Sequence, residues 1–510
     1  MTQDSAALYN AYASRDPRFD GVFFIGVTST GIYCRPVCTA KTPKAANCRF
    51  FNSAEAAEKA SFRPCLRCRP ELAPGNAPVD DAPRIAGLIA YRIEQGPGTA
   101  LEKIAAQFGW SSRQIRRILH RELGVSPIEL VLTRRLLLAK QLLTETALPI
   151  IEVAFASGFS SLRRFNDAFR SRYGMPPSRL RKAAAGTAGS ATAAESFTLQ
   201  LTYRAPFDWQ GVLRFLSARM LKGVEWVEED AYLRTVQLGG HTGWVNLRHA
   251  PEKRALLVEL THSLTPVLPA LLGRLRNLFD LSARPDVIAA QLMRDALLAE
   301  AVARNPGLRV PGAFDGFELA VRAILGQQIS VKAATTLAGR FAAAFGEPVD
   351  TPHPGLTRLC PTPQRIAAAK VEELTALGIL EARARSILLV AEEVASGRLR
   401  LEAGAQPDAT IERLVALPGI GRWTAQYIAM RALRWPDAFP KEDIALRNNL
   451  GGVTPARAEQ LSQAWRPWRS YATLHLWQSL TPPRAFRTSI GSAAGPPAGR
   501  LRARGRPVGA

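Results

Sequence analysis

The sequence predicts a multidomain, mainly α-helical protein, and three observations carry this prediction. The chain has 510 residues, which is too long for one hydrophobic core and indicates three or four domains. Most of its cysteines lie in one short N-terminal stretch, which predicts a small zinc-stabilised α+β domain. Apolar residues at helical spacing dominate the remainder, apart from alternating residues near the middle. We therefore expect a four-cysteine α+β domain, an all-α domain, an α+β antiparallel-sheet subdomain and a larger all-α domain.

The charge of the chain indicates a polyanionic partner. Lys and Arg outnumber Asp and Glu by 66 to 43, which gives a formal net charge of +23 and a pI of about 10.4. Nucleic acid is therefore the expected partner, and an arginine-rich soluble protein without such a partner is the alternative. No uncharged apolar stretch is long enough to span a bilayer, and the N-terminus lacks a basic segment followed by an apolar run. We expect a cytoplasmic monomer with no membrane partner.

Four cysteines within residues 1–75 have the spacing of a metal site. The pattern C-x3-C-x26-C-x2-C is formed by Cys34, Cys38, Cys65 and Cys68. In a reducing compartment, two close pairs indicate zinc before they indicate disulfides, and a domain this small needs such support. The sequence therefore predicts one Zn²⁺ held by four thiolates. Cys48 and Cys360 lie outside the pattern.

Residues 82–182 repeat a helix-turn-helix pattern. The first copy has an apolar face that begins at Leu101 and is interrupted at Gly109, and the second copy is interrupted at Gly158. In each copy the second helix exposes basic residues of the type that reaches base edges and phosphates. The expected DNA contacts are Arg113, Arg117, Arg163 and Arg164. For each of them, a solvated helix face is the alternative.

Residues 183–195 are small and polar and predict a linker. The next segment, 196–282, begins with an alternating strand, continues with an amphipathic helix and then has further short alternating runs. We expect an antiparallel sheet with two helices there, and no chemistry. Residues 483–510 are Gly, Pro, Ala and Arg without periodicity, which predicts a disordered basic tail that adds non-specific DNA affinity.

Residues 283–482 are helical by period, and the stretch LPGIGRWTAQYIAMRALRWPDAFPKEDIALR, from Leu417, carries their chemistry. Gly419 and Gly421 permit positive φ and a close approach of DNA phosphate to the N–H groups at the start of the next helix. Asp443 follows a second, Pro-bounded loop. The alternatives are that the Gly turn only ends a helix, that Trp423 and Tyr427 are core residues, and that the acid is a helix N-cap or a solvated carboxylate.

The order of Gly turn, aromatic helix, Pro loop and acid resembles the helix-hairpin-helix DNA glycosylases, in particular the 3-methyladenine DNA glycosylase II (AlkA-type) branch. The resemblance implies that Asp443 is the catalytic carboxylate. It also implies an aromatic substrate pocket, formed by Trp423, Tyr427 and Trp477, and a wedge residue in the GQQIS motif, Gln328. For Gln328, a buried hydrogen-bonding side chain is the alternative. Relatives that also cut the backbone have a lysine in place of Trp423, so the resemblance implies hydrolysis alone. Some relatives have Tyr in place of Ile444, so one pocket wall is expected to differ.

The N-terminal sequence GIYCRPVC…FRPCLRCRP resembles the zinc domain of the Ada response protein, which takes a methyl group from DNA methylphosphotriesters. By this match Cys34 is the acceptor, and Cys38, Cys65 and Cys68 are its companion ligands. The alternative is a purely structural zinc module with no methyl transfer. Methylation would lower the negative charge of the cluster and strengthen DNA attraction by surrounding basic residues. These residues are Arg35, Lys41, Lys44, Arg49, Arg63, Arg67 and Arg69. The 82–182 region, with its order GFSS…YGMPPS, resembles the AraC-type DNA-binding domain.

The sequence is thus interpreted as a fusion of an alkylation sensor with a repair glycosylase acting on double-stranded alkylated and promoter DNA. A glycosylase of bacterial type would work at the nucleoid, and transcription regulation adds RNA polymerase as a candidate partner. The alternative is a methylation-responsive transcription activator whose glycosylase half only binds damage. The PCHR motif of the Ada methyltransferase domain is absent, so O6-methylguanine repair is not predicted.

Overall fold

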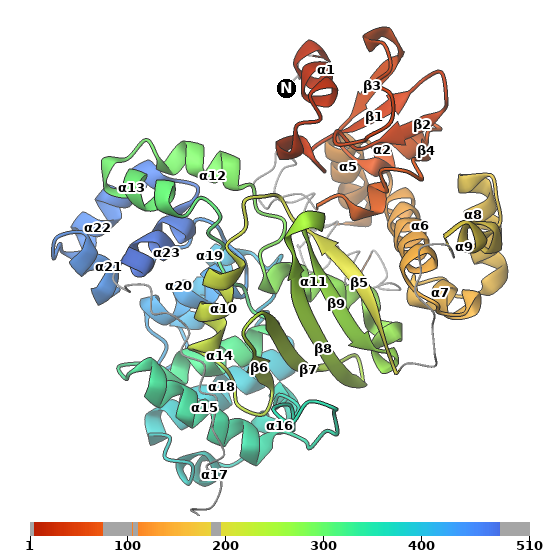
Figure 1. Cartoon of the computed structure of the whole chain (residues 1–510). Coiled ribbons are helices and arrows are strands. Elements are labelled where there is room, and N and C mark those ends of the chain that lie inside the picture. Colours follow the sequence, from red (N-terminus) through yellow and green to blue (C-terminus); the bar gives the residue numbers. More distant parts are fainter. Residues whose placement is uncertain (1–4, 75–101, 103–104, 106–110, 185–194, 480–510) are drawn as a thin grey trace, which may run out of the picture.

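The computed structural model describes residues 5–74, 102, 105, 111–184 and 195–479. Figure 1 shows four groups of elements in chain order: a small N-terminal α+β unit, a helical unit beside it, a central antiparallel sheet, and a large helical unit on the far side of the sheet. This arrangement confirms the predicted fold class. The first helix of the first helix-turn-helix copy lies almost wholly outside the described residues, as do most of the 183–195 linker and the 483–510 tail.

The N-terminal unit is organised around a four-stranded sheet in the order β3-β1-β2-β4. The elements are α1 (Ser5–Ala13), β1 (Phe24–Val27), β2 (Ile32–Cys34), β3 (Cys48–Phe51), α2 (Ala54–Lys59) and β4 (Arg63–Pro64). Strands β2 and β4 are parallel, with Tyr33 opposite Pro64. Since Cys34 and Cys65 directly follow these two residues, this register brings the two cysteine pairs together although they are far apart in the chain.

The second unit is helical throughout its described part. Its elements are α5 (Ser112–Leu123), α6 (Pro127–Glu145), α7 (Ile150–Ala156), α8 (Leu162–Tyr173) and α9 (Pro177–Ala184). Serine side chains cap α5, α6 and α8, and glycines in the left-handed conformation end α5 and α8. Gly158, with φ of 89°, makes the predicted turn between α7 and α8. The second helix-turn-helix copy therefore forms as its sequence indicates.

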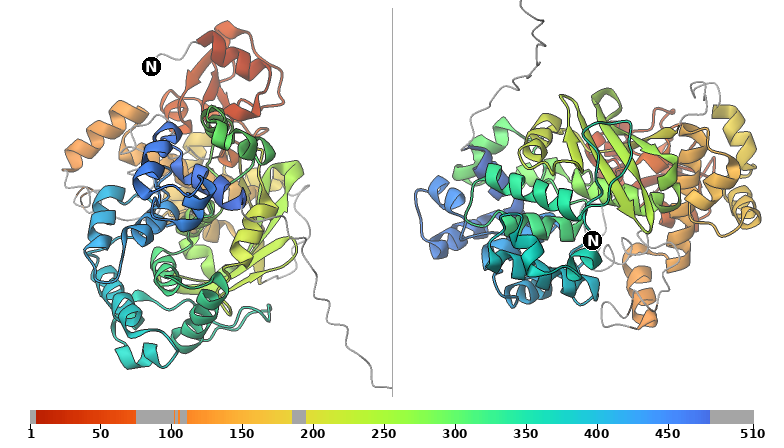
Figure 2. Two further views of the ribbon diagram at one scale, coloured as in Figure 1. Left: turned by 90° about the vertical axis from the view of Figure 1, so that its left-hand side faces the viewer. Right: turned by 90° about the horizontal axis from the view of Figure 1, so that it is seen from below.

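The third unit is a five-stranded antiparallel sheet in the order β5-β9-β8-β7-β6. Its strands are β5 (Ser196–Thr202), β6 (Glu225–Val227), β7 (Ala231–Leu238), β8 (His241–Ala250) and β9 (Ala255–Thr261), and its helices are α10 (Trp209–Ser217) and α11 (Leu268–Leu278). One apolar core joins this sheet to α6 and α8 of the second unit. Figure 2 shows, in the view from below, the sheet lying between the second unit and the C-terminal helices.

The fourth unit packs its helices around one apolar core. Its helices are α12 (Pro285–Leu292), α13 (Ala296–Arg304), α14 (Gly316–Leu325), α15 (Val331–Phe345), α16 (Pro363–Ala367), α17 (Val371–Thr375), α18 (Glu381–Ala395), α19 (Pro407–Val415), α20 (Arg422–Arg431), α21 (Ile444–Asn449), α22 (Pro455–Leu461) and α23 (Arg469–Ser479). Among the described residues, no helix has both the length and the apolar character needed to cross a bilayer.

Candidate functional site

Asp443 stands at the start of α21 and accepts three hydrogen bonds. Its Oδ1 accepts the Leu446 backbone N–H at 2.7 Å, so the carboxylate is the N-cap of α21. The indole N–H of Trp423 donates to Oδ2 at 2.8 Å, and the indole N–H of Trp477 donates to Oδ1 at 3.1 Å. The N-cap alternative is therefore correct, but it describes only part of the environment. The two indoles come from α20 and α23, so three helices fix one carboxylate.

An aromatic wall adjoins this carboxylate. The rings of Trp423 and Tyr427 are stacked, with centroids 5.3 Å apart and planes 7° from parallel, because the two residues lie one turn apart on α20. The Trp477 ring lies 6.4 Å from that of Tyr427. The structure thus brings Trp423, Tyr427, Trp477 and Asp443 together. Ile444, the first residue of α21, directly follows the acid and is 70% exposed.

Arginine side chains adjoin Tyr427 of the aromatic wall. Arg431 donates to the Tyr427 hydroxyl at 2.7 Å and to the backbone carbonyls of Pro311 and Gly312. Burial acts to raise the pKa of Tyr427, but the charges of Arg431 and Arg219 outweigh it and leave the pKa below its ordinary value. Sequence reasoning missed this support. The only signal for it is a basic residue one turn after Tyr427 on the same helix face.

The predicted Gly-rich turn connects α19 to α20. Gly419 has φ of +83°, the left-handed region that glycine adopts without strain. A Cβ there would stand 2.1 Å from the Ser386 hydroxyl oxygen, so the position also lacks room for a side chain. Gly421 is the exposed N-cap of α20, and a Cβ at this position would meet no atom within 4 Å. The first N–H groups of α20 therefore begin at an open surface, as phosphate binding requires.

Gln328 lies between α14 and α15, in the GQQIS motif. It is exposed and has φ of +56°, a left-handed conformation that is uncommon for a residue with a side chain. Gln327, next to it, points inward and donates to Gly419 O at 3.0 Å and to the Thr424 hydroxyl at 3.1 Å. Sequence reasoning assigned no role to Gln327, although the motif contains it.

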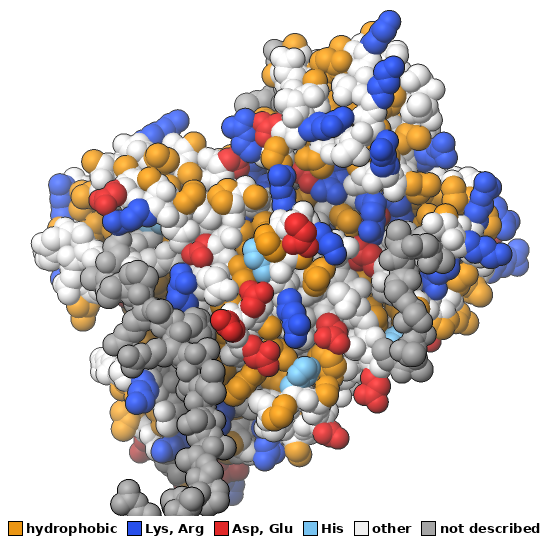
Figure 3. Space-filling view, in the orientation of Figure 1, with side chains coloured by type: hydrophobic (Ala, Val, Ile, Leu, Met, Phe, Trp, Pro, Cys, Tyr) orange, Lys and Arg blue, Asp and Glu red, His pale blue; other side chains and the backbone are white. Residues whose placement is uncertain are grey.

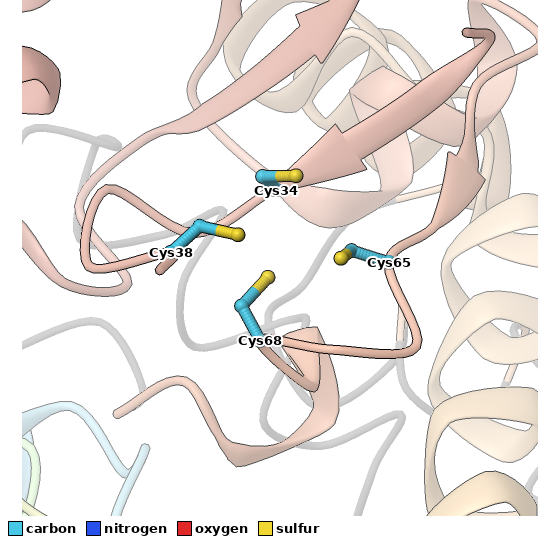
Figure 4. A group of neighbouring side chains, drawn as sticks. All are labelled: Cys34, Cys38, Cys65 and Cys68. Carbon is cyan, nitrogen blue, oxygen red and sulfur yellow. The ribbon is translucent and has the colours of Figure 1, made fainter. Parts of the chain in front are cut away.

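The four cysteines of the N-terminal unit converge on one point. Figure 4 shows Cys34 and Cys38 facing Cys65 and Cys68, with the four sulfurs turned toward one another. All four sulfurs lie within 4.8 Å of one another, and the four cysteines form no disulfide. Tetrahedral zinc with bonds of about 2.3 Å needs sulfurs slightly under 4 Å apart. The donor set and its geometry therefore fit one Zn²⁺. Cys34, at the end of β2, is 5% exposed, and Cys68 is the most accessible of the four.

Cations hold the backbone around these cysteines. The Arg35 N–H donates to the Cys68 sulfur at 3.3 Å, and its guanidinium donates to Cys68 O at 3.0 Å while pairing with Asp20. Lys140 of α6, with 1% of its side chain exposed, donates to Cys65 O at 2.9 Å and pairs with Glu71 at 2.6 Å. A cation from the helical unit thus reaches the zinc loop. The sequence feature that could have indicated this role of Lys140 is a single charge within an apolar helix face.

Two of the seven basic residues around the cysteines form ion pairs within the protein. Arg35 pairs with Asp20, and Arg69 pairs with Glu71 and Glu145. Buried carboxylates hold these two side chains against neighbouring elements, and the attraction of DNA by the seven residues stays a prediction. Figure 3 still shows Lys and Arg side chains gathered over the N-terminal and helical units, on the face seen in that view.

The predicted DNA contacts of the helical unit are all exposed. Arg113 and Arg117 lie on α5, and Arg163 and Arg164 on α8. The polar faces of both helices stay open because Ile115 and Leu119 on α5, and Phe165 on α8, carry the packing.

Protein-family profiles match four consecutive parts of the chain. Residues 7–71 match the metal binding domain of Ada, and residues 104–183 match a helix-turn-helix domain. Residues 198–315 match the AlkA N-terminal domain, and residues 321–469 match the HhH-GPD superfamily base excision DNA repair protein. These matches follow the order of the four structural units.

One similar protein spans nearly the whole chain, and others span its C-terminal half. A probable bifunctional transcriptional activator/DNA repair enzyme AlkA of Mycobacterium tuberculosis is 42% identical over 493 residues, which cover 95% of this chain and 98% of that one. DNA-3-methyladenine glycosylase 2 of Escherichia coli is 37% identical over 278 residues, 54% of this chain and 95% of that one. Among solved structures, 3-methyladenine DNA-glycosylase from Archaeoglobus fulgidus is 23% identical, covers 55% of this chain and 97% of that one, and has a TM-score of 0.49. The chain therefore belongs to the family of bifunctional transcriptional activator/DNA repair enzymes, in which an Ada-like zinc and helix-turn-helix region is joined to an AlkA-type helix-hairpin-helix DNA glycosylase region.

Proposed function

We propose that the C-terminal half hydrolyses the N-glycosidic bond of alkylated purines of the 3-methyladenine type in double-stranded DNA, with Asp443 as the catalytic carboxylate. The observation that carries the proposal is that the aromatic wall is hydrogen-bonded to the carboxylate. Trp423 and Trp477 both donate to Asp443 and both belong to the wall that would receive the base. A base held against these rings would therefore place its sugar near the acid.

The chemistry follows from charge. A flipped purine alkylated at a ring nitrogen is cationic and is attracted to the faces of electron-rich rings. When the bond from C1′ to nitrogen breaks, its electron pair neutralises the base and leaves a positive, oxocarbenium-like sugar. The Asp443 carboxylate stabilises this charge. A carboxylate has about four acceptor positions and three are occupied, so one remains to orient the attacking water, whose oxygen bonds to C1′ while its proton leaves to the carboxylate or to solvent.

The test is base release from DNA containing 3-methyladenine, measured for wild type and Asp443→Asn. We expect wild type to release the base and the variant to lose at least about a hundredfold in rate. Asp295→Asn is a matched control, because Asp295 also caps a helix and also accepts an indole N–H, that of Trp465, at 2.7 Å. Equal rates in wild type and Asp443→Asn would refute the assignment. They would leave the alternative, a transcription activator whose glycosylase half only binds damage.

The same site argues against backbone cleavage. A glycosylase with lyase activity forms a Schiff base through an amine, and Trp423 occupies the position at which such relatives carry lysine. We expect no covalent protein–DNA adduct after borohydride treatment of a reacting mixture. An adduct would show that some lysine attacks C1′.

The phosphate backbone of DNA would approach the exposed N-terminus of α20. Gly419 and Gly421 would bring phosphate to the free N–H groups there, and exposed Gln328 would enter the space left by the flipped base. Arg113, Arg117, Arg163 and Arg164 would contact promoter DNA, with RNA polymerase as a further partner. Replacing each by alanine and measuring DNA affinity against salt concentration would show which of them bind phosphate, since removing a phosphate-binding arginine lowers the salt slope by about one.

A second candidate activity concerns the N-terminal unit. The converging sulfurs support transfer of a methyl group from a DNA methylphosphotriester to Cys34. A zinc ion bound by the four cysteines would keep their thiols deprotonated at neutral pH. A sulfur electron pair would form a bond to the methyl carbon as its bond to the phosphate oxygen breaks, leaving a thioether and a phosphodiester anion. Peptide mass spectrometry after incubation with methylphosphotriester DNA should locate one methyl group on Cys34. A methyl on more accessible Cys68, or no added mass, would refute this assignment.

A further inference from the structure

The two turns that would meet DNA are joined by one side chain. Gln327 leaves the turn between α14 and α15 and reaches the hairpin turn between α19 and α20. Its amide nitrogen donates to Gly419 O at 3.0 Å and to the Thr424 hydroxyl at 3.1 Å. The residues are 92 and 97 positions apart in the chain, so no local geometry dictates this contact. Gln327 thus connects the segment that presents Gln328 with the segment that presents Gly419.

Helix α18 also contacts both of these turns. We call the two turns, together with Gln327 and this part of α18, the junction. The Arg383 guanidinium donates to the backbone carbonyl of Gln327, and the Ser386 hydroxyl donates to Pro418 O at 2.9 Å. One turn of α18 therefore holds both DNA-facing turns by their backbone. The absence of a side chain at Gly419 is part of this fit, since a Cβ would collide with the Ser386 hydroxyl.

The junction also explains the backbone of Gln328. A left-handed conformation in a residue with a side chain costs about 1 kcal/mol or more and persists only where its surroundings enforce it. Gln327 before it is held by three hydrogen bonds, and Ser330 after it caps α15 by accepting the Ala333 N–H at 3.2 Å. With both sides held, the Gln328 side chain can only project outward.

One contact of the junction lies next to a residue that holds the carboxylate. Thr424, the second acceptor of Gln327, follows Trp423, whose indole N–H donates to Asp443 at 2.8 Å. A displacement of the Gln328 turn would therefore also displace the first turn of α20. This turn carries Trp423, one of the two residues whose indoles donate to the acid.

We propose that Gln327 is a positioning residue that fixes the exposed Gln328 against the hairpin, and so sets where a flipped nucleotide lies relative to Asp443. The proposal rests on the proposed glycosylase function. Gln327 contacts neither the carboxylate nor the aromatic wall in the described contacts; it acts through Gly419, Thr424 and the backbone of its neighbour.

The test replaces Gln327 by methionine, which has a similar length and no N–H donor. We expect single-turnover release of 3-methyladenine to slow about tenfold or more, because small misplacements of reacting groups have large effects on rate. Fluorescence of 2-aminopurine beside the lesion should show a smaller or slower flipping signal. The matched control is Gln364→Met, since Gln364 is exposed on α16, and it should match wild type in both measurements.

A double-mutant cycle separates positioning from general destabilisation. Thr424→Val removes one acceptor of the Gln327 amide, so Gln327→Met combined with Thr424→Val should be little slower than Gln327→Met alone. The proposal is overturned if Gln327→Met has wild-type rate and fluorescence, or if only its melting temperature falls. It is also overturned if the two substitutions add fully. Failure of the glycosylase assignment would differ, since wild type itself would then release no base while the fluorescence still reported on flipping.

Discussion

The zinc centre and the carboxylate centre are held in different ways. The carboxylate of Asp443 is fixed by side chains of one helical unit, those of Trp423 and Trp477, and by the N–H of Leu446. The zinc loop is fixed through its backbone, partly by Lys140 from a different unit. One centre is therefore complete within its unit, and the other depends on its neighbour.

The neighbour is in turn attached to the central sheet. Glu145 of α6 accepts the Gln200 N–H at 3.1 Å, and Gln141 donates to Gln200 O at 2.9 Å, so side chains bind the free backbone of the edge strand β5. Arg69 links Glu145 back to Glu71, the partner of Lys140. The zinc centre thus shares a buried polar network with two other units, whereas the described contacts of Asp443 stay within one. Four measurements test whether the two centres differ in this way.

The largest expected effect comes from removing the metal. Chelation should unfold the N-terminal unit, because structural zinc contributes on the order of 10 kcal/mol to the folding of such a small domain. Base release should stay near the wild-type rate, since the described hydrogen bonds of Asp443 all come from the fourth unit. Hydrogen exchange across β1 to β4, measured beside base release, checks both expectations. A parallel loss of base release would show that the two centres are coupled.

Lys140→Met should come next. It leaves Glu71 buried without its closest cation, and breaking a buried ion pair costs about 3 kcal/mol or more. The loss should appear as faster hydrogen exchange around Cys65 and as a lower urea midpoint. Lys182→Met, on the exposed side of α9, is the matched control. Combining Lys140→Met with Glu71→Leu should recover stability. A variant as stable as wild type would show that the network contributes little.

The carboxylate centre should respond to acid through His475, which lies two residues before Trp477 on α23. Burial lowers the pKa of His475 to about 4 from an ordinary value of 6.5, so folding favours the neutral ring. This contribution to stability is fully present above pH 6.5 and is lost as the pH falls toward 4. Between pH 7.5 and 5 we expect a loss of about 2 kcal/mol, read from urea unfolding of the C-terminal half. His475→Leu should remove this part of the pH dependence. An unchanged profile would contradict the prediction.

The smallest effect expected is that of Trp477→Phe. It keeps an aromatic ring but removes one of the three hydrogen bonds to Asp443. A hydrogen bond to a charged group contributes about 1.5 kcal/mol or more, so base release should slow about tenfold while binding of the alkylated base changes less. Trp465→Phe, which removes the corresponding bond to Asp295, should leave the rate unchanged. Equal effects of the two substitutions would mean that the bond matters only for stability.

Much of the architecture could be predicted because it follows from local patterns. The two short-range cysteine pairs, the glycine breaks at Gly158 and Gly419 and the alternating residues of the sheet each determine structure over a few residues. The alternating strand predicted at the start of 196–282 corresponds to β5, and the short alternating runs predicted after it correspond to β6–β9. The roles of individual residues at the sites, including Cys34 and Gln328, stay predictions.

Composition and spacing along the chain indicate the chemical groups available: four thiolates for a metal, one acid after an aromatic helix, and a surplus of positive charge. Which of these groups meet depends on how distant elements pack. The register of β2 against β4 brings the cysteine pairs together, and α23 brings a second indole to Asp443. Asp20, which binds Arg35, and Glu145, which binds Arg69, likewise come from distant positions. Spacing along the chain specifies only contacts within a few residues, whereas these depend on how whole helices and strands pack.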